Sequence, residues 1–342
     1  MSTHPKEIAV KKNKIMEVCG THTAAISKFG LRNFFDGVDM VSGPGCPVCV
    51  TPSNRIEQCV VLSRNRNIII ATFGDMLRVP SITSSFEKEK SSGADIRIIY
   101  SVYDCLKIAS ENQKKEVVFA GAGFETTAPA AAVLIKEAYK RKVKNFSVFS
   151  MFKSVFPALE NIAKSKDLKI DGFLLPGNVA SITGSDDFKF LKKPCVVSGF
   201  LENEIISAVN ILERLIKDKK NKIANAYGYA VSPGGNKKAK KFISEVFDLG
   251  DDYWRGLGVI KKSGFKINSK YENFDADKKF CIKPVSFRKD ACLCGKIMKG
   301  IITPDKCPGF AKKCVPENPL GPCMVSSEGI CAAYYKYGES EK

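Results

Sequence analysis

Short apolar and β-branched runs alternate with longer amphipathic segments up to about Phe200. Buried strands of parallel sheets are short continuous apolar runs, whereas surface helices carry apolar residues on one face. The alternation is therefore typical of βαβ units and predicts an α/β fold with parallel sheets. The predicted strands cover residues 15–18, 38–42, 67–72, 96–101, 116–120, 146–151, 172–175 and 195–198, and the predicted helices cover 21–29, 52–64, 103–111, 126–142, 155–166, 202–218 and 236–247.

The pattern predicts two successive parallel-sheet α/β domains followed by a cysteine-rich C-terminal domain. We place the first domain at residues 14–113, the second at 114–222 and the third at 223–342. Two polar stretches interrupt the pattern. Residues 83–95 are expected to form a loop or hinge, and residues 261–290 to separate the α/β part from the cysteine-rich tail.

Glycine and chemically active residues directly follow five of the predicted strands. The carboxyl ends of parallel strands face the crevice in which ligands bind, so these turns are expected to converge on one or two clefts. Ordinary turn chemistry explains one such turn better than it explains five. The turns are Cys19-Gly20, Gly43-Pro44-Gly45-Cys46, Gly74-Asp75, Gly121-Ala122-Gly123-Phe124-Glu125 and Pro176-Gly177. Within them, Asp75 and Glu125 either shuttle protons near a metal or cap the following helices, and both interpretations stay open.

The charge balance raises the question of nucleic acid. The chain has 54 Lys and Arg against 36 Asp and Glu, which gives a formal net charge of +18. The lysines lie in short scattered runs, without a basic helix or an interleaved set of aromatic residues. A solvated surface, or one that meets an acidic protein, is therefore favoured, and nucleic acid is not an expected partner.

The role of the thirteen cysteines depends on whether the chain lies in a reducing or an oxidising compartment. Residues 1–14 lack the apolar core of a signal peptide, and no apolar run approaches the roughly 18 residues of a membrane span. We therefore expect a cytoplasmic protein without a membrane segment, in which clustered cysteines bind metal or act as redox thiols. Four isolated cysteines are expected to be small buried hydrophobes, namely Cys59, Cys105, Cys195 and Cys281.

Three cysteines near the N-terminus form a candidate metal site. Cys46 and Cys49 have the C-x-x-C spacing, which lets two thiols chelate one metal or close a small disulfide ring. Cys19 follows the first strand, with His22 at the start of the next helix, and it meets the pair if the first two strands are neighbours. A thioredoxin-like dithiol, a closed Cys3His zinc site and an open transition-metal site all compete. Glycine-rich loops at strand ends favour the open site, and the cysteine-rich tail favours iron.

Six further cysteines lie near the C-terminus among prolines and glycines. Such a segment buries little apolar surface and needs a cross-linking centre. Four thiolates can hold a [4Fe–4S] cluster, whereas a zinc ribbon usually has two C-x-x-C knuckles, and this segment has none. The spacing favours the cluster but does not select four ligands from Cys292, Cys294, Cys307, Cys314, Cys323 and Cys331.

Taken together, the motifs closely resemble those of the HypD family of hydrogenase maturation factors, from about residue 14 to residue 337. The resembling motifs are MEVCGTHT at 16–23, GPGCPVCVTP at 43–52, FGDM at 73–76 with RVP at 78–80, GFETTAP at 123–129, and GPCMVSSEG at 321–329 before Cys331. The resemblance implies a scaffold on which the Fe(CN)2CO unit of [NiFe]-hydrogenases, an Fe(II) with cyanide and carbonyl ligands, is assembled. The implied partners are a HypC-type chaperone, a HypE-type cyanide donor and, through HypC, the hydrogenase large-subunit precursor.

The resemblance also implies roles for individual cysteines. The iron unit would be held at Cys19, with Cys49 as a further iron ligand and Cys46 as the other member of the thiol pair. The family's C-x14-C-x6-C-x16-C cluster pattern falls on Cys292, Cys307, Cys314 and Cys331. It leaves Cys294 and Cys323 as a second redox thiol pair.

This chain departs from the family at two positions where histidine is common, since it has Asn178 and Ala24 there. His22 is therefore the one candidate near these motifs for imidazole chemistry at neutral pH. The predicted reactive set is Cys19, His22, Cys46, Cys49, Asp75 and Glu125.

A redox-active assembly scaffold is expected rather than an enzyme with classical turnover. The strongest rival is a thiol–disulfide oxidoreductase with a structural iron–sulfur cluster, which rests on the two thiol pairs. A nucleotide-dependent enzyme is suggested by Gly121-Ala122-Gly123, but Thr126 replaces the third glycine of the dinucleotide fingerprint. A nucleic-acid-binding iron–sulfur protein is the third alternative.

Overall fold

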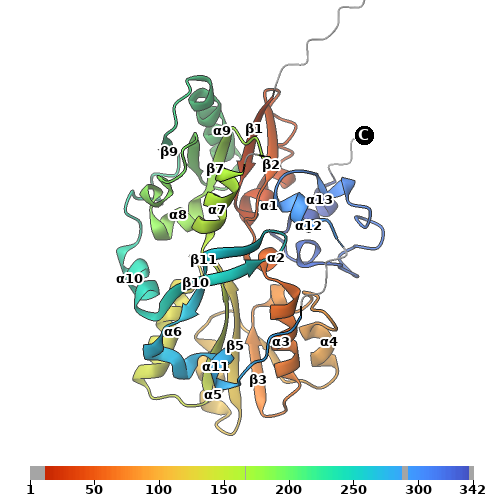
Figure 1. Cartoon of the computed structure of the whole chain (residues 1–342), viewed down its shortest axis with the longest axis vertical. Helices are drawn as coiled ribbons and strands as arrows, with labels where there is room; N and C mark the ends of the chain where they lie inside the picture. Colours follow the sequence, from red (N-terminus) through yellow and green to blue (C-terminus); the bar gives the residue numbers. More distant parts are fainter. Residues whose placement is uncertain (1–11, 166, 287–291, 339–342) are drawn as a thin grey trace, which may run out of the picture.

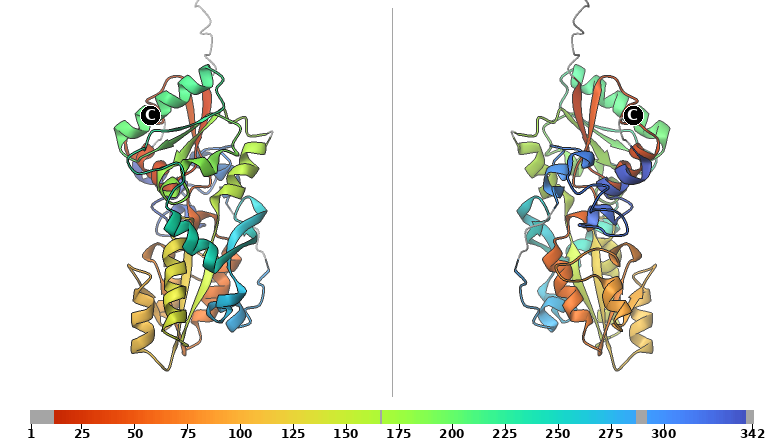
Figure 2. Two further views of the ribbon diagram at one scale, coloured as in Figure 1. Left: turned by 90° about the vertical axis from the view of Figure 1, so that its left-hand side faces the viewer. Right: turned by 90° about the vertical axis from the view of Figure 1, so that its right-hand side faces the viewer.

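The computed structural model describes residues 12–165, 167–286 and 292–338. Two parallel sheets form the two lobes of an elongated molecule (Figure 1). The cysteine-rich segment packs beside the junction of the lobes, and the two side views show the same stacking of lobes (Figure 2). The predicted α/β class with parallel sheets is confirmed.

The upper sheet of Figure 1 has the strand order β2-β1-β7-β8-β9, and all its pairings are parallel. Apolar side chains alternate along β1, so Ile15 packs with α1 and α9 on one face and Met16 packs with α7 and α8 on the other. The strands are β1 (Asn13–Glu17), β2 (Val38–Ser42), β7 (Gly172–Pro176), β8 (Cys195–Ser198) and β9 (Ile223–Asn225), and the helices are α1 (Gly20–Lys28), α7 (Val155–Lys164), α8 (Gly177–Thr183) and α9 (Glu202–Lys217).

The lower sheet has the order β4-β3-β5-β6, also parallel. Helices α5 and α6 pack on one face, and α2, α3 and α4 lie against the other. The strands are β3 (Ile68–Thr72), β4 (Ile96–Ile98), β5 (Glu116–Gly123) and β6 (Phe146–Phe152), and the helices are α2 (Pro47–Val50), α3 (Ser53–Ser63), α4 (Phe86–Ser91), α5 (Asp104–Glu111) and α6 (Ala128–Lys140).

After β9 the chain forms a helix, a hairpin and the cysteine-rich tail. The antiparallel hairpin lies at the junction of the lobes (Figure 1), where Lys153 at the end of β6 bridges to Gly264. The tail ends in a helix that packs against α1. The elements are α10 (Lys237–Val246), β10 (Phe247–Trp254), β11 (Gly258–Ile267), α11 (Ala276–Lys279), α12 (Cys294–Met298) and α13 (Ile330–Tyr337).

All eight predicted strands and all seven predicted helices are present, with bounds within three residues of those expected; residue 166 lies outside the described part. Two expectations were wrong. Residues 83–95 are not simply a loop, because Ser85 caps α4 by accepting a hydrogen bond from the Lys88 N–H. Residues 261–290 contain most of β11 and all of α11, with 287–290 outside the described residues. The polar content of these segments concealed elements that are only half-buried.

The strands of each sheet are not consecutive in sequence. β1 and β2 from the predicted segment 14–113 pair into the sheet of β7, β8 and β9, while β3 and β4 pair into the sheet of β5 and β6. Strand pairing thus runs across the expected boundary at 113/114. Periodicity identifies strands but not their neighbours, and the domain boundaries at 113/114 and 222/223 remain predictions.

Candidate functional site

A cavity of about 470 Å³ opens between the carboxyl ends of the two sheets. The turns after β1, β2, β3, β5 and β7 all contribute to it, together with residues 326–328 of the tail. The predicted convergence of these turns is therefore confirmed. Its polar lining consists of Cys19, Asp75, Tyr100, Thr126, Thr127, Asn178, Ser326, Ser327 and Glu328.

Cys19 presents a free thiol to this cavity. It is the N-cap residue of α1, and its thiol donates a hydrogen bond to Oδ1 of Asn178 at 3.6 Å. The residue is only 3% exposed, and burial raises the pKa of the thiol to about 12, although the first N–H groups of α1 oppose this shift. Cys19 is therefore a neutral thiol at neutral pH. A metal ion bound at its sulfur would displace the proton.

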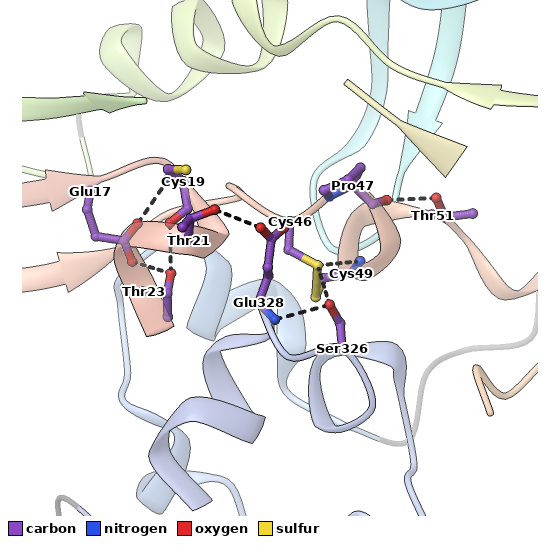
Figure 3. The surroundings of a disulfide bond; sticks show 10 residues. All are labelled: Glu17, Cys19, Thr21, Thr23, Cys46, Pro47, Cys49, Thr51, Ser326 and Glu328. Atoms are coloured by element: carbon purple, nitrogen blue, oxygen red, sulfur yellow. Dashed lines mark hydrogen bonds between the residues drawn. A yellow bond between two sulfur atoms is a disulfide. The ribbon is translucent and has the colours of Figure 1, made fainter. Parts of the chain in front are cut away.

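Cys46 and Cys49 form a disulfide beside the Cys19 turn (Figure 3). The Cys49 N–H lies 3.1 Å from Cys46 Sγ, and the Ser326 hydroxyl of the tail lies 3.5 Å from the same sulfur. The Gly20 N–H donates to the Gly45 carbonyl at 3.0 Å, so the two turns touch through their backbones. β1 and β2 are neighbours, so the turn of Cys19 lies beside the turn that carries Cys46 and Cys49, but Cys19 alone of the three cysteines lines the cavity. In this oxidised state Cys49 carries no thiol for a metal.

His22 does not line the cavity. Its Nε2 lies 2.8 Å from the Gly199 carbonyl oxygen, so this nitrogen carries the proton, and the ring packs against Phe200. Burial lowers the pKa of His22 to about 4. The ring is therefore neutral at physiological pH and joins α1 to the end of β8.

The two candidate carboxylates occupy different environments. Asp75 lines the cavity and is exposed as a whole residue. The surrounding protein partly desolvates its carboxyl group, which raises the pKa of Asp75. Glu125 is buried and is not part of the lining. Its Oε1 accepts hydrogen bonds from Ser154 Oγ at 2.7 Å and from the Val155 N–H at 3.1 Å. Burial nevertheless raises the pKa of Glu125 to about 7. It caps a helix, but this helix is α7 rather than α6, which follows it in sequence.

Glu328 is a site residue to which sequence reasoning gave no role. It belongs to the tail, and its Oε1 accepts a 2.8 Å hydrogen bond from the Thr21 hydroxyl beside Cys19 (Figure 3). A Cβ on Gly20 would lie 2.4 Å from Glu328 Cβ, so only glycine permits this approach. Burial raises the pKa of Glu328, and Asp75 adds to the shift. Its place in the GPCMVSSEG motif was the available signal.

All six tail cysteines line a second, small cavity. The Arg255 guanidinium donates to Cys292 Sγ and the Leu320 N–H donates to Cys314 Sγ, both at 3.4 Å. Burial and the neighbouring thiols raise the pKa values of Cys314 and Cys331. Among residues 12–165, 167–286 and 292–338, no three His, Cys, Asp or Glu side chains converge with the geometry of a single metal ion.

The isolated cysteines are buried with one exception. Cys59, Cys105 and Cys195 are buried, which raises the pKa of each thiol. Cys281 is exposed, contrary to expectation. It follows the short helix α11 in a left-handed turn with a φ of 47°, and its neighbours Phe280 and Ile282, but not Cys281, pack against the core.

Comparison with known proteins identifies the family. The family model described as "HypD: Hydrogenase formation hypA family" matches residues 2–338. The chain belongs to the HypD family. It is 42% identical to hydrogenase maturation factor HypD2 of Bradyrhizobium diazoefficiens, over 96% of this chain and 90% of that protein. It is 40% identical to HypD of Escherichia coli, over 99% and 93% of the two chains, and 40% identical to HypD of Cupriavidus necator, over 96% and 90%.

Membership of the HypD family assigns the chain to hydrogenase maturation. A maturation factor acts on another protein, so protein partners are implied. In the parts of the chain that the structure describes, no helix has the length and apolar character needed to cross a bilayer.

Proposed function

We propose that the chain is a cytoplasmic scaffold on which the Fe(CN)2CO unit of [NiFe]-hydrogenases is assembled. The observation that supports this most is the free thiol of Cys19 in a cavity between two sheets, whose wall includes Gly45, Pro47 and Val48 of the turn that carries the Cys46–Cys49 disulfide. Thiolate is a soft ligand that suits low-spin iron(II). The iron unit is the cargo, with Cys19 as its protein ligand. Cys49 becomes available as a second ligand once the disulfide is reduced.

The size of the cavity supports assembly in contact with another protein. About 470 Å³ is more than an iron atom with three diatomic ligands requires. The remaining space can admit a group from the partner that delivers ligands or accepts the finished unit. The proposed partners are a HypC-type chaperone, a HypE-type cyanide donor and, through HypC, the hydrogenase large-subunit precursor.

The tail is proposed to hold a [4Fe–4S] cluster through Cys292, Cys307, Cys314 and Cys331. All four residues line one cavity, and thiolates are the ligands that such clusters take. The donors from Arg255 and Leu320 suit sulfurs that carry negative charge. When bound, the cluster supplies single electrons at a potential that these hydrogen bonds tune.

The thiol pairs are proposed to connect the two centres. Reduction of the Cys46–Cys49 disulfide takes two electrons and two protons and yields two thiols. Cys294 and Cys323 line the tail cavity and belong to the same apolar core as Cys46 and Cys49. Buried sulfur side chains therefore extend from the tail cavity towards the C-x-x-C pair.

Infrared spectroscopy of the anaerobic protein, purified with its small chaperone, tests the proposal. The wild-type complex should show C–N and C–O stretching bands. Cys19→Ala should remain folded and brown but lose these bands, because the thiolate ligand is missing. Cys59→Ala is the matched control, since Cys59 is also buried but lies in α3 outside both cavities. Bands that persist in Cys19→Ala would reject Cys19 as the ligand.

A thiol–disulfide oxidoreductase is the alternative that the Cys46–Cys49 disulfide favours. The exposed fractions of Cys46 and Cys49 are 4% and 2%, which leaves little access for a protein disulfide. Turnover of a generic disulfide substrate by the purified protein, lost in Cys46→Ala, would support this alternative.

A further inference from the structure

Glu17 is a fully buried carboxylate directly beneath the Cys19 turn (Figure 3). It is the last residue of β1, and its Oε2 accepts a 3.0 Å hydrogen bond from the Cys19 N–H. Its Oε1 accepts a 2.6 Å bond from the hydroxyl of Thr23 in the first turn of α1. The side chain therefore clamps both ends of the turn that presents the thiol.

The same carboxylate reaches the neighbouring strand. Ser42, the last residue of β2, is hydrogen-bonded to Glu17 and also accepts a 2.8 Å bond from Arg32. Arg32 donates a further 2.7 Å bond to the carbonyl of Met40 in β2. Arg32 is the nearby cation that opposes the effect of burial on Glu17. A buried charge is tolerated when it is paired and hydrogen-bonded in this way.

Arg32 extends this network to the tail. Its guanidinium lies 5.0 Å from the centre of the Tyr334 ring, within the range of a cation–π contact. Tyr334 belongs to α13, three residues after Cys331, and α13 packs against α1. Contacts thus run from the Cys19 turn through Glu17, Ser42 and Arg32 to the helix that carries Cys331.

We propose that Glu17 is the positioning residue of the Cys19 site, and that Ser42, Arg32 and Tyr334 tie this position to α13. The turn of Cys19 and the turn of Gly45 are packed so closely that a Cβ on Gly45 would lie 2.3 Å from the Cys19 nitrogen. A small displacement of either turn would therefore disturb this packing. Without the carboxylate, the Cys19 N–H and the hydroxyls of Thr23 and Ser42 lose a shared acceptor. The turn then relaxes, and the thiol leaves the position that it holds beside Asn178.

The first test uses hydrogen exchange and does not depend on the proposed function. In Glu17→Ala, the Cys19 amide should exchange about tenfold faster because its acceptor is gone, and the amides of residues 20–23 should also exchange faster because the turn relaxes. Peptides from α13 should also exchange faster, whereas peptides from β3 and β5 should not. Glu57→Ala is the matched control, because Glu57 is another buried carboxylate that holds a loop, through Ser81 and Thr83. It should accelerate exchange only around residues 81–83.

The second test rests on the proposed function and uses the infrared bands of the chaperone complex. Glu17→Ala should retain the iron unit about 10- to 100-fold less well, as expected when a residue that orients a metal ligand is lost. Glu17→Gln should restore the bands, because its amide oxygen can accept from Cys19 while its NH2 donates to Thr23. Tail iron and sulfide should be unchanged in both variants. A role in folding alone would not give this pattern of loss and rescue.

The proposal would be overturned if Glu17→Ala showed the same amide exchange rates and the same infrared band intensities as the wild type. If Glu17→Ala does not fold, Ser42→Ala serves instead, since it removes only the bridging hydroxyl and should shift both measurements in the same direction. Absence of bands from the wild-type complex would defeat the proposed function, but the exchange test would still decide the role of Glu17.

Discussion

The Thr21 hydroxyl donates a 2.8 Å hydrogen bond to the carboxylate of Glu328, a residue 307 positions away in sequence. Thr21 lies in the first turn of α1, two residues after Cys19, and Glu328 lies two residues before α13. The bond fastens the cysteine-rich tail to the turn that presents the Cys19 thiol. The tail is therefore part of the wall of the cavity and not an appended module.

Thr21→Val should loosen this attachment without a change of side-chain shape. The loss of one hydrogen bond to a partly buried carboxylate is expected to cost about 1–3 kcal/mol. Chemical denaturation measures the loss, and protease cleavage within residues 322–329 should accelerate. Ser110→Ala is the control, because it removes an exposed hydroxyl bond within α5 and should change neither measurement. Unchanged cleavage of the tail would show that the bond does not anchor it.

Local elements were predictable here because most strands are short apolar runs, and five of them lead into turns that contain glycine. The bounds of β2 and β8 were predicted without error. The order of strands was not predictable. Ile15 and Ile69 both lie in apolar runs typical of buried strands, although the two strands belong to different sheets. The approach of Glu328 to Cys19 depends on this long-range pairing. Periodicity carries no information about this approach, and the available signals were Gly20 and the place of Glu328 in the GPCMVSSEG motif.

Cys314→Ala should remove one ligand from the proposed cluster. We expect the variant to contain substantially less iron and acid-labile sulfide than the wild type, with a tail that is less protected in hydrogen exchange. Cys281→Ala is the matched control, because this exposed cysteine lies outside the tail cavity. Unchanged iron and sulfide in Cys314→Ala would refute this ligand assignment.

Lys153→Met should strongly destabilise the fold. Lys153 Nζ lies 2.6 Å from Asp252 Oδ2, and this buried pair joins the end of β6 to the β10–β11 hairpin. Removal of Lys153 leaves the mostly buried Asp252 carboxylate with Lys266 Nζ, 3.8 Å away, as its remaining cation, and the expected loss in the free energy of unfolding is about 1–3 kcal/mol. Lys164→Met breaks an exposed i,i+4 pair with Glu160 and should cost less than about 0.5 kcal/mol. Equal losses in the two variants would contradict the role of burial.

Glu125→Gln should change how stability depends on pH. Burial raises the pKa of Glu125 from 4.5 to about 7, so between these values the folded chain binds a proton that the unfolded chain does not. Its contribution is therefore fully present below pH 4.5 and is lost as the pH rises towards 7, by up to about 3 kcal/mol. Glutamine keeps the acceptor for Ser154 and Val155 but does not ionise.

The variant should therefore match the wild type near pH 4.5 and exceed it in stability at pH 8. The comparison must be made as a difference between the two proteins, because His22 acts in the opposite direction. The pKa of His22 falls from 6.5 to about 4, so its contribution grows as the pH rises from 4 to 6.5. His22 is the same in both proteins, so its contribution cancels when the unfolding free energy of the wild type is subtracted from that of the variant. Parallel curves of unfolding free energy against pH would show that Glu125 does not titrate in this range.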